Sequence, residues 1–159
     1  MGNSAYGTDL EPRMIEMTRK NLEWLDKKDS LNYKLEPGDA TNYKWTGSIN
    51  FIATETYLGQ AFSAPPSEVK LKDVQHVTKS IITGFLKNIS PQLDKNTCLA
   101  LAIPAWKRPN GSFSHLKILD ELDRLGYNLE KYSNLEQSDL LYHREDQIVA
   151  REILVLRSK

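Results

Sequence analysis

The chain has 159 residues, of which 40% are hydrophobic and 26% are charged, and its formal net charge is zero. This composition is that of one globular domain, and the balanced charge excludes the overall basic field of an autonomous nucleic-acid binder. The apolar stretches at residues 98–103 and 148–156 are far shorter than the roughly 20 residues of a membrane helix. We therefore expect a single domain over residues 1–159, no membrane span and, without a secretion signal, a cytoplasmic location.

The first third of the chain predicts a strand, a helix and a second strand. Residues 5–9 are β-type, and Pro12 suits the first position of the next helix, because its missing N–H would have no intrahelical partner there. A charged run at residues 26–29 is expected to end this helix, and residues 33–36 form a short strand before a Pro-Gly turn. The inward stripe of the helix is expected at Met14, Met17, Thr18, Leu22 and Leu25.

The middle of the chain predicts a buried strand and a long helix. Residues 49–54 are typical of a strand that is buried on both faces. The helix is expected to begin at Ser67 and to end near Pro91. Its buried face is expected at Leu71, Val74, Thr78, Ile81, Phe85 and Ile89.

The last third adds a strand, a helix and a hairpin. The strand covers residues 97–103, the helix runs from Ser114 to Gly126, and two β-type runs at 140–144 and 148–156 flank a short turn. Alternating strands and helices predict an α/β fold with a mostly parallel sheet and helices on both faces. The terminal hairpin is expected to place one antiparallel strand at the edge of that sheet.

Four motifs occur in order on matching elements: GTDL at residues 7–10, GDA at 38–40, TETYLG at 54–59, and the hairpin at 142–153. In this order they resemble the class I, Rossmann-like methyltransferases that use S-adenosylmethionine. The likeness is to the tRNA guanosine N2-methyltransferases and their THUMP-associated relatives, and it spans nearly the whole chain. The resemblance implies S-adenosylmethionine as cofactor and nucleic acid, tRNA above all, as substrate.

Two acidic residues are candidates for the cofactor site, because ligands of an open α/β sheet bind outside the carboxyl ends of its strands. The resemblance assigns Asp9, with Leu10 beside it, to the ribose hydroxyls, and Asp39 to the adenine amine, with Ala40 leaving room for the ring. The alternatives are structural. Asp9 would favour the start of a helix through the helix dipole, and Asp39 would cap backbone N–H groups in its turn.

The candidate catalytic residues follow the middle strand. Related amino-methylating enzymes carry Asp/Asn-Pro-Pro-Tyr/Phe there, whereas this chain has Thr54 at the acidic position and Tyr57 at the aromatic one. A base amine must lose a proton when it is methylated, and Glu55 is the best available acceptor, with Tyr57 as a stacking surface. The alternative is a solvated Glu55 with Tyr57 in the core.

A cluster of Trp106, Lys107 and Arg108 follows the strand at residues 97–103, where it could contact a phosphate backbone or form a solvated loop. The three histidines lie far apart in the sequence, so no metal site is expected.

In the resembling family, a first strand and a glycine-rich loop precede the residues that match this chain, and that strand lies between the second and the fourth. Without them, we expect two open sheet edges inside the fold and the need for an N-terminal segment or a partner chain. The same residues allow two alternatives to tRNA methylation. One is a DNA amino-methyltransferase, and the other is an inactive methyltransferase fragment that serves as an interaction module.

Overall fold

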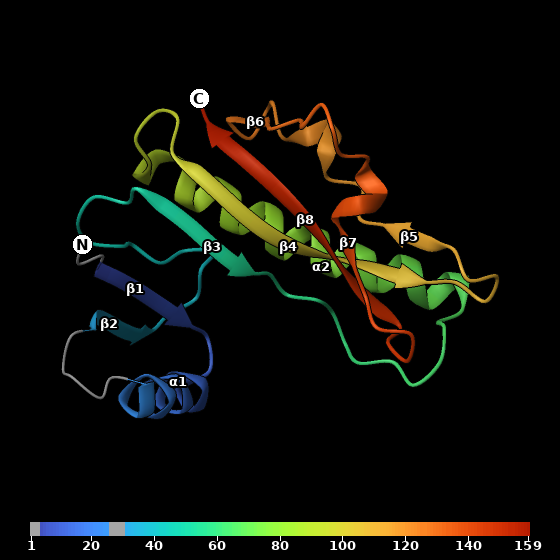
Figure 1. Ribbon diagram of the computed structural model, residues 1–159, viewed down its shortest axis with the longest axis horizontal. Coiled ribbons are helices and arrows are strands. Elements are labelled where there is room, and N and C mark those ends of the chain that lie inside the picture. The colour runs from blue at the N-terminus through green and yellow to red at the C-terminus, as the bar shows by residue number, and fades with distance from the viewer. Residues whose placement is uncertain (1–3, 26–30) are drawn as a thin grey trace.

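A computed structural model describes residues 4–25 and 31–159 (Figure 1). The helices are α1 (Pro12–Leu25) and α2 (Glu68–Ile89), and short 3-10 turns occur at Ser90–Gln92, Leu119–Glu121 and Gln137–Leu140. The strands are β1 (Ser4–Asp9), β2 (Asn32–Pro37), β3 (Phe51–Glu55), β4 (Cys98–Lys107), β5 (Phe113–His115), β6 (Tyr127–Leu129), β7 (Leu141–Tyr142) and β8 (Val149–Ser158). Among these residues, no helix is long and apolar enough to cross a membrane.

The strands form two sheets. β1 pairs in parallel with β2, and a separate sheet has the order β3-β4-β8-β6, with β5 on β4 and β7 on β8. β3 is parallel to β4, and β8 is antiparallel to both β4 and β6. The α/β fold class and the β7–β8 hairpin are confirmed. The antiparallel strand β8 does not lie at the edge of the sheet, however. It pairs with β4 along one side and with β6 on the other.

The two helices lie on opposite faces of the sheets. α1 connects β1 to β2 and packs against both strands, whereas α2 connects β3 to β4 and runs behind β4 in Figure 1. The β1–α1–β2 and β3–α2–β4 connections run in opposite directions across the sheets. Because such parallel crossovers are right-handed, their helices lie on opposite faces. The core lies between α2 and the larger sheet. Its fully buried members include Ile82, Leu86, Leu99, Leu101, Ile103, Trp106, Leu154 and Leu156.

Helix α2 confirms the expected start but not the whole expected face. The Ser67 hydroxyl caps the helix by accepting from the Lys70 backbone N–H at 3.4 Å. Ile81 is exposed and Ile82 is buried in its place, because the inward residues advance in steps of four along most of the helix. The buried positions are Leu71, Val74, Thr78, Ile82, Leu86 and Ile89.

Helix α1 differs from expectation in the side that it buries. Ile15 is buried, and Leu22 is half-buried on the same side, whereas Met14, Met17 and Leu25 are exposed. The helix has only the two strands β1 and β2 to cover, so part of its apolar surface has no counterpart among the described residues. The charged run at residues 26–29 lies outside the described residues.

Strand β3 is not buried on both faces, which corrects the sequence expectation. Its residues alternate between exposed and half-buried, and the Phe51 side chain is 57% exposed. The half-buried positions Ile52 and Thr54 face α2. The opposite face of β3 has no helix over it in Figure 1, so its apolar residues stay in contact with solvent.

The helix expected from Ser114 to Gly126 is wrong. Residues 113–115 form β5, which pairs with the end of β4, and a 3-10 turn and further turns follow. Leu116 and Ile118 are both buried with an exposed residue between them, which is the alternation of an extended segment. The Gln75 side chain on α2 fixes this segment by donating to the Ser114 hydroxyl at 3.0 Å.

Candidate active site

The carboxyl ends of β1, β2 and β3 lie on one side of the molecule, where their arrowheads point in Figure 1. β1 and β2 end together, because Asp9 pairs with Pro37 and the Gly38 N–H donates to the Asp9 carbonyl at 2.9 Å. The structure therefore brings Asp9 and Asp39 to neighbouring loops. Glu55 ends β3, on the other side of the gap that separates the two sheets.

Among the residues that the structure describes, Asp9 makes one side-chain hydrogen bond at this edge. Its Oδ1 accepts from the Glu11 N–H at 2.8 Å, in the turn that leads into α1. The residue is exposed, and so is the Leu10 side chain, at 68%. A solvent-facing carboxylate that is held by one backbone bond is able to accept further hydrogen bonds from a hydroxyl-bearing ligand.

Asp39 is engaged within its own turn. Oδ1 accepts from the Thr41 N–H at 2.9 Å and the Thr41 hydroxyl at 2.7 Å, and Oδ2 accepts from the Asn42 amide at 3.3 Å. The two bonds from Thr41, the backbone N–H first and then the hydroxyl, lower the pKa of the Asp39 carboxyl. The Ala40 carbonyl accepts from the Asn88 amide at 3.0 Å, which ties this loop to α2. The turn-capping role of Asp39 is therefore observed.

A third carboxylate near this edge, Glu36, was not singled out by the sequence. Glu36, on β2, accepts from the hydroxyls of Tyr43 and Tyr6 and forms an ion pair with Lys34 at 3.0 Å. The Tyr43 bond, then Tyr6 and Lys34, lower the pKa of Glu36 to about 2. Only the parallel register of β1 and β2, which places Tyr6 opposite Lys34, assembles this cluster.

Glu55 forms an ion pair that the sequence did not predict. The Arg151 Nε donates to Glu55 Oε1 at 2.6 Å, and the Glu55 side chain is still 53% exposed. Arg151 comes from β8, so the contact crosses β4, where the partner of Glu55 is the small residue Ala102. This ion pair fixes the orientation of the Glu55 carboxylate at the end of β3.

The other residues of this loop face two directions. Thr54 is half-buried, and its hydroxyl donates to the Glu55 carbonyl at 3.1 Å. The Thr56 N–H and hydroxyl both donate to the Ala102 carbonyl at 3.0 Å, which holds the loop to β4. Tyr57 is 46% exposed, so part of its ring is available to a planar ligand. Glu55 and Tyr57 thus both contact solvent next to the end of β3.

The cluster at residues 106–108 lies apart from this edge. Lys107 is five positions beyond Ala102, the β4 partner of Glu55, which is about 16 Å along a strand. Trp106 is fully buried, so its indole ring belongs to the core and offers no stacking surface. The Lys107 ammonium donates to the Glu145 carbonyl at 3.1 Å, and the Arg108 guanidinium donates to the Ser114 hydroxyl at 3.3 Å.

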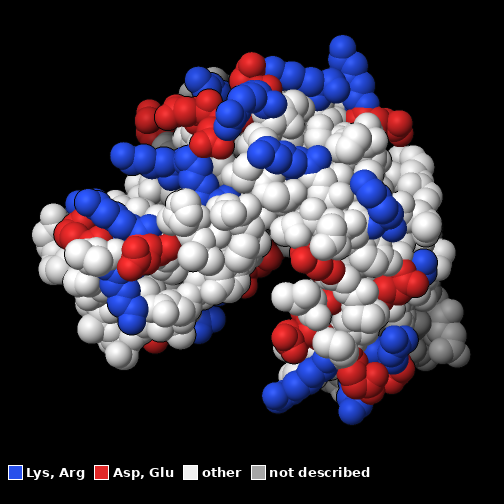
Figure 2. Space-filling view, turned by 180° about the vertical axis from the view of Figure 1, so that it is seen from behind, with Lys and Arg blue, Asp and Glu red and all other residues white. Residues whose placement is uncertain are grey.

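Figure 2 shows a hollow in the surface between the part that contains α1 and the rest of the molecule. Acidic and basic side chains are interspersed over this view, in keeping with the net charge of zero. This face therefore carries no broad basic track of the kind that binds a nucleic-acid backbone without help from other segments.

No protein-family model and no curated protein matches the sequence. Solved structures do match it in fold. The chain has the Rossmann-like α/β fold of S-adenosylmethionine-dependent methyltransferases.

Three solved proteins illustrate this likeness. An S-adenosylmethionine-dependent methyltransferase from Methanosarcina mazei matches with a TM-score of 0.61 and 12% identity, over 99% of this chain and 82% of its own. TrmN from Thermus thermophilus matches at 0.53 and 14%, over 97% of this chain but only 36% of its own. An rRNA methylase from Streptococcus thermophilus matches at 0.54 and 13%, over 96% and 72%.

Proposed function

We propose that this chain is part of a methyltransferase that moves a methyl group from S-adenosylmethionine to an exocyclic base nitrogen of nucleic acid. Guanosine N2 in tRNA is the target that the sequence motifs imply. The observation that carries the proposal is the placement of Asp9 and Asp39 on one side of the carboxyl edge and of Glu55 and Tyr57 on the other. An rRNA methylase among the proteins of the same fold supports a nucleic-acid substrate.

The residues present fit the adenosine half of S-adenosylmethionine. The exposed Asp9 carboxylate, with one backbone bond, can accept from the ribose hydroxyls, while Leu10 offers exposed apolar surface beside it. Asp39 is less free, because both of its oxygens already accept bonds, so its turn would shape the adenine pocket with Ala40 as the small wall. When bound, S-adenosylmethionine supplies an electrophilic methyl group.

The chain's own part in the reaction is to position the base and to take its proton. Tyr57 would stack on the target base, and Glu55 would accept a proton from the exocyclic amine as the nitrogen becomes methylated. The Arg151 guanidinium orients the Glu55 carboxylate until the amine displaces or shares that contact. Lys107 and Arg108, about 16 Å further along β4, would contact backbone phosphates outside the reaction site.

Single-turnover methylation by the protein that contains this chain, at saturating cofactor and with tRNA as substrate, tests these roles. Glu55→Gln keeps the size of the side chain but removes the proton acceptor, so the rate should fall by roughly 10²–10⁴-fold while cofactor affinity changes little. Arg151→Gln is the matched control, because it breaks the same ion pair but keeps the acceptor. Equal losses in the two variants would show that only the ion pair matters.

Two further variants separate substrate from cofactor binding in the same assay. Tyr57→Ala should lose base stacking, about 1–3 kcal/mol, and weaken the use of RNA. Asp9→Ala should instead weaken cofactor binding and leave RNA binding unchanged. Transfer to DNA but not to RNA would favour a DNA amino-methyltransferase and reject the tRNA target.

A second candidate function is an interaction module without catalysis. The engagement of both Asp39 oxygens within the turn and the pairing of Glu55 with Arg151 favour it, because each removes binding capacity from a proposed site residue. Methyl transfer by the protein, abolished by Glu55→Gln, would exclude this candidate.

A further inference from the structure

Strands β4 and β8 extend well beyond the end of β3. Glu55, the last residue of β3, pairs with Ala102, and β4 continues to Lys107, about 16 Å further along the strand. We call this part of the sheet the projecting ribbon, which consists of residues 103–107 of β4, residues 149–152 of β8, and the short strands β5 and β7. Figure 1 shows it to the right of the β3 arrowhead, so it borders the edge that carries the proposed base-binding residues.

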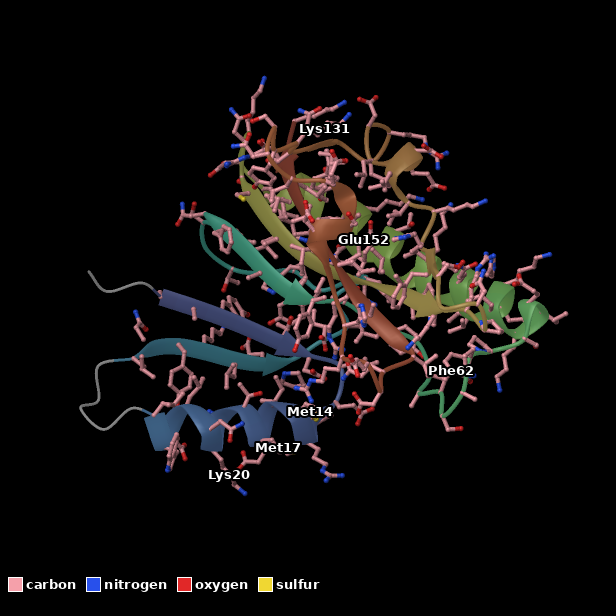
Figure 3. The ribbon with its side chains drawn as sticks, turned by 45° about the vertical axis from the view of Figure 1, so that its right-hand side comes forward. Met14, Met17, Lys20, Phe62, Lys131 and Glu152 are labelled. Carbon is pink, nitrogen blue, oxygen red and sulfur yellow. The ribbon has the colours of Figure 1, made fainter. Side chains whose placement is uncertain are left out.

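Side-chain contacts hold β5 in place on the projecting ribbon. The His115 Nδ1 and the Glu152 Oε2 lie 2.9 Å apart, and Glu152, which Figure 3 shows on β8, is buried. The Gln75 amide of α2 donates to the Ser114 hydroxyl at 3.0 Å and to the His115 carbonyl at 3.3 Å. Phe113, the first residue of β5, is thereby fixed before any ligand binds, which lowers the entropy cost of binding to its ring.

Two aromatic rings lie side by side at the end of the projecting ribbon. The Phe113 ring and the His143 ring, from the turn between β7 and β8, have centroids 4.9 Å apart and planes tilted by 46°. Phe113 is half-buried and His143 is exposed. We call these two rings the ring platform. Because every nucleobase has a π-face, an exposed aromatic surface of this kind can stack on an unpaired base of any sequence.

Two cations next to the ring platform keep their positive charge. The Lys107 ammonium donates to the Glu145 main-chain carbonyl at 3.1 Å, and the Arg108 guanidinium donates to the Ser114 hydroxyl at 3.3 Å. Both of these acceptors are neutral, so the bonds orient the cations without neutralising them. The exposed carboxylates of Glu145 and Asp146 confine the positive charge to this short stretch. Such a site suits the phosphates of a few nucleotides and not a long duplex.

The turn at residues 143–148 also connects the ring platform to the proposed proton acceptor. The Gln147 Oε1 accepts from the Arg151 Nη1 at 3.4 Å, and the Arg151 Nε donates to Glu55 at 2.6 Å. His143 and Gln147 therefore link both places through one short element. A nucleic-acid strand that presents one base to Tyr57 can continue along the projecting ribbon and present another base to the ring platform.

We propose that the ring platform stacks on an unpaired base of the RNA substrate, on a nucleotide near the methylated one, while Lys107 and Arg108 bind the phosphates beside it. This inference rests on the proposed function and specifies its substrate class. The methylated nucleotide lies in a single-stranded segment, because a base inside a duplex is stacked on its neighbours and offers no free face.

Fluorescence anisotropy with a short labelled RNA, single-stranded or annealed to its complement, tests the proposal. The 159-residue protein should bind the single strand with a Kd of roughly 1–100 μM. Phe113→Leu should weaken this binding roughly fivefold or more and leave binding of the duplex nearly unchanged. Phe113→Tyr keeps an aromatic ring and should bind the single strand almost as the parent does. Phe51→Leu, which removes the exposed ring of β3, is the matched control and should change neither affinity.

The salt dependence of the same binding separates stacking from phosphate contacts. Lys107→Gln should reduce the slope of log Kd against log salt concentration by about one, whereas Phe113→Leu should leave the slope unchanged. An unchanged affinity of Phe113→Leu for the single strand, an equal loss for the duplex, or no RNA binding by the parent would overturn the proposal. The assay contains no methyl donor, so a protein that binds RNA in this way but transfers no methyl group would reject only the proposed reaction.

Discussion

At the scale of single residues, Glu36 makes the folded state sensitive to acid. Hydrogen bonds from Tyr43 and Tyr6 and the ion pair with Lys34 lower its pKa to about 2, from an ordinary value of 4.5. A carboxyl with a lowered pKa contributes stability that is present above pH 4.5 and is lost as the pH falls towards 2. Urea unfolding followed across this range should therefore show a decline in the free energy of unfolding.

Glu36→Gln identifies the source of this decline. The variant should be less stable than the parent protein at neutral pH and should lose much of the dependence on pH between about 4.5 and 2. Glu23→Gln, at an exposed position of α1, should keep the parental dependence. An unchanged profile in Glu36→Gln would show that other carboxyl groups cause the acid sensitivity.

At the scale of elements, the loop after β3 is held against α2 through Gly59. This glycine has a φ of +86°, and a Cβ there would lie 2.7 Å from a Val74 methyl carbon and 3.4 Å from the Thr78 hydroxyl. Gly59→Ala should thus combine backbone strain with a steric clash and lower the free energy of unfolding by about 2–4 kcal/mol.

Gly111→Ala separates the two causes in the same urea titration. Gly111 has a φ of +84°, and a Cβ at this residue would meet no other atom within 4 Å, so only the backbone strain of about 1–2 kcal/mol applies. Equal losses at the two glycines would mean that the loop after β3 moves away from α2 without cost.

At the scale of the whole molecule, the separation of the two sheets limits cofactor binding. The residues that fit the adenosine half follow β1 and β2 in one sheet, whereas Glu55 ends β3 in the other. Isothermal titration of the 159-residue protein with S-adenosylmethionine should give a Kd above roughly 100 μM. Adenosine should bind about as well, because the contacts proposed here involve only the nucleoside. Micromolar affinity for S-adenosylmethionine would contradict this account.

The sequence by itself determined the order of most elements and the class of fold. Local sequence patterns predicted the start of α2 at Ser67, the buried strand β4 and the closing β7–β8 hairpin. Such patterns succeed because the periodicity of apolar residues reflects local secondary structure. It failed at residues 114–126, where apolar residues at helical spacing belong to a segment that pairs with β4 and bonds to Gln75. Backbone pairing over a long sequence separation overrides such a pattern.

Tertiary structure alone decided what surrounds each candidate residue. Glu55 pairs with Arg151 across β4, Trp106 is buried in the core, and the cluster around Glu36 forms between β1 and β2. Each of these environments depends on the register between strands, which no local sequence pattern encodes. The same is true of α1 and β3. Their apolar residues predicted burial, but a side chain is buried only where another layer covers it. In the part of the chain that the structure describes, no such layer covers Met14, Met17, Leu25 or Phe51.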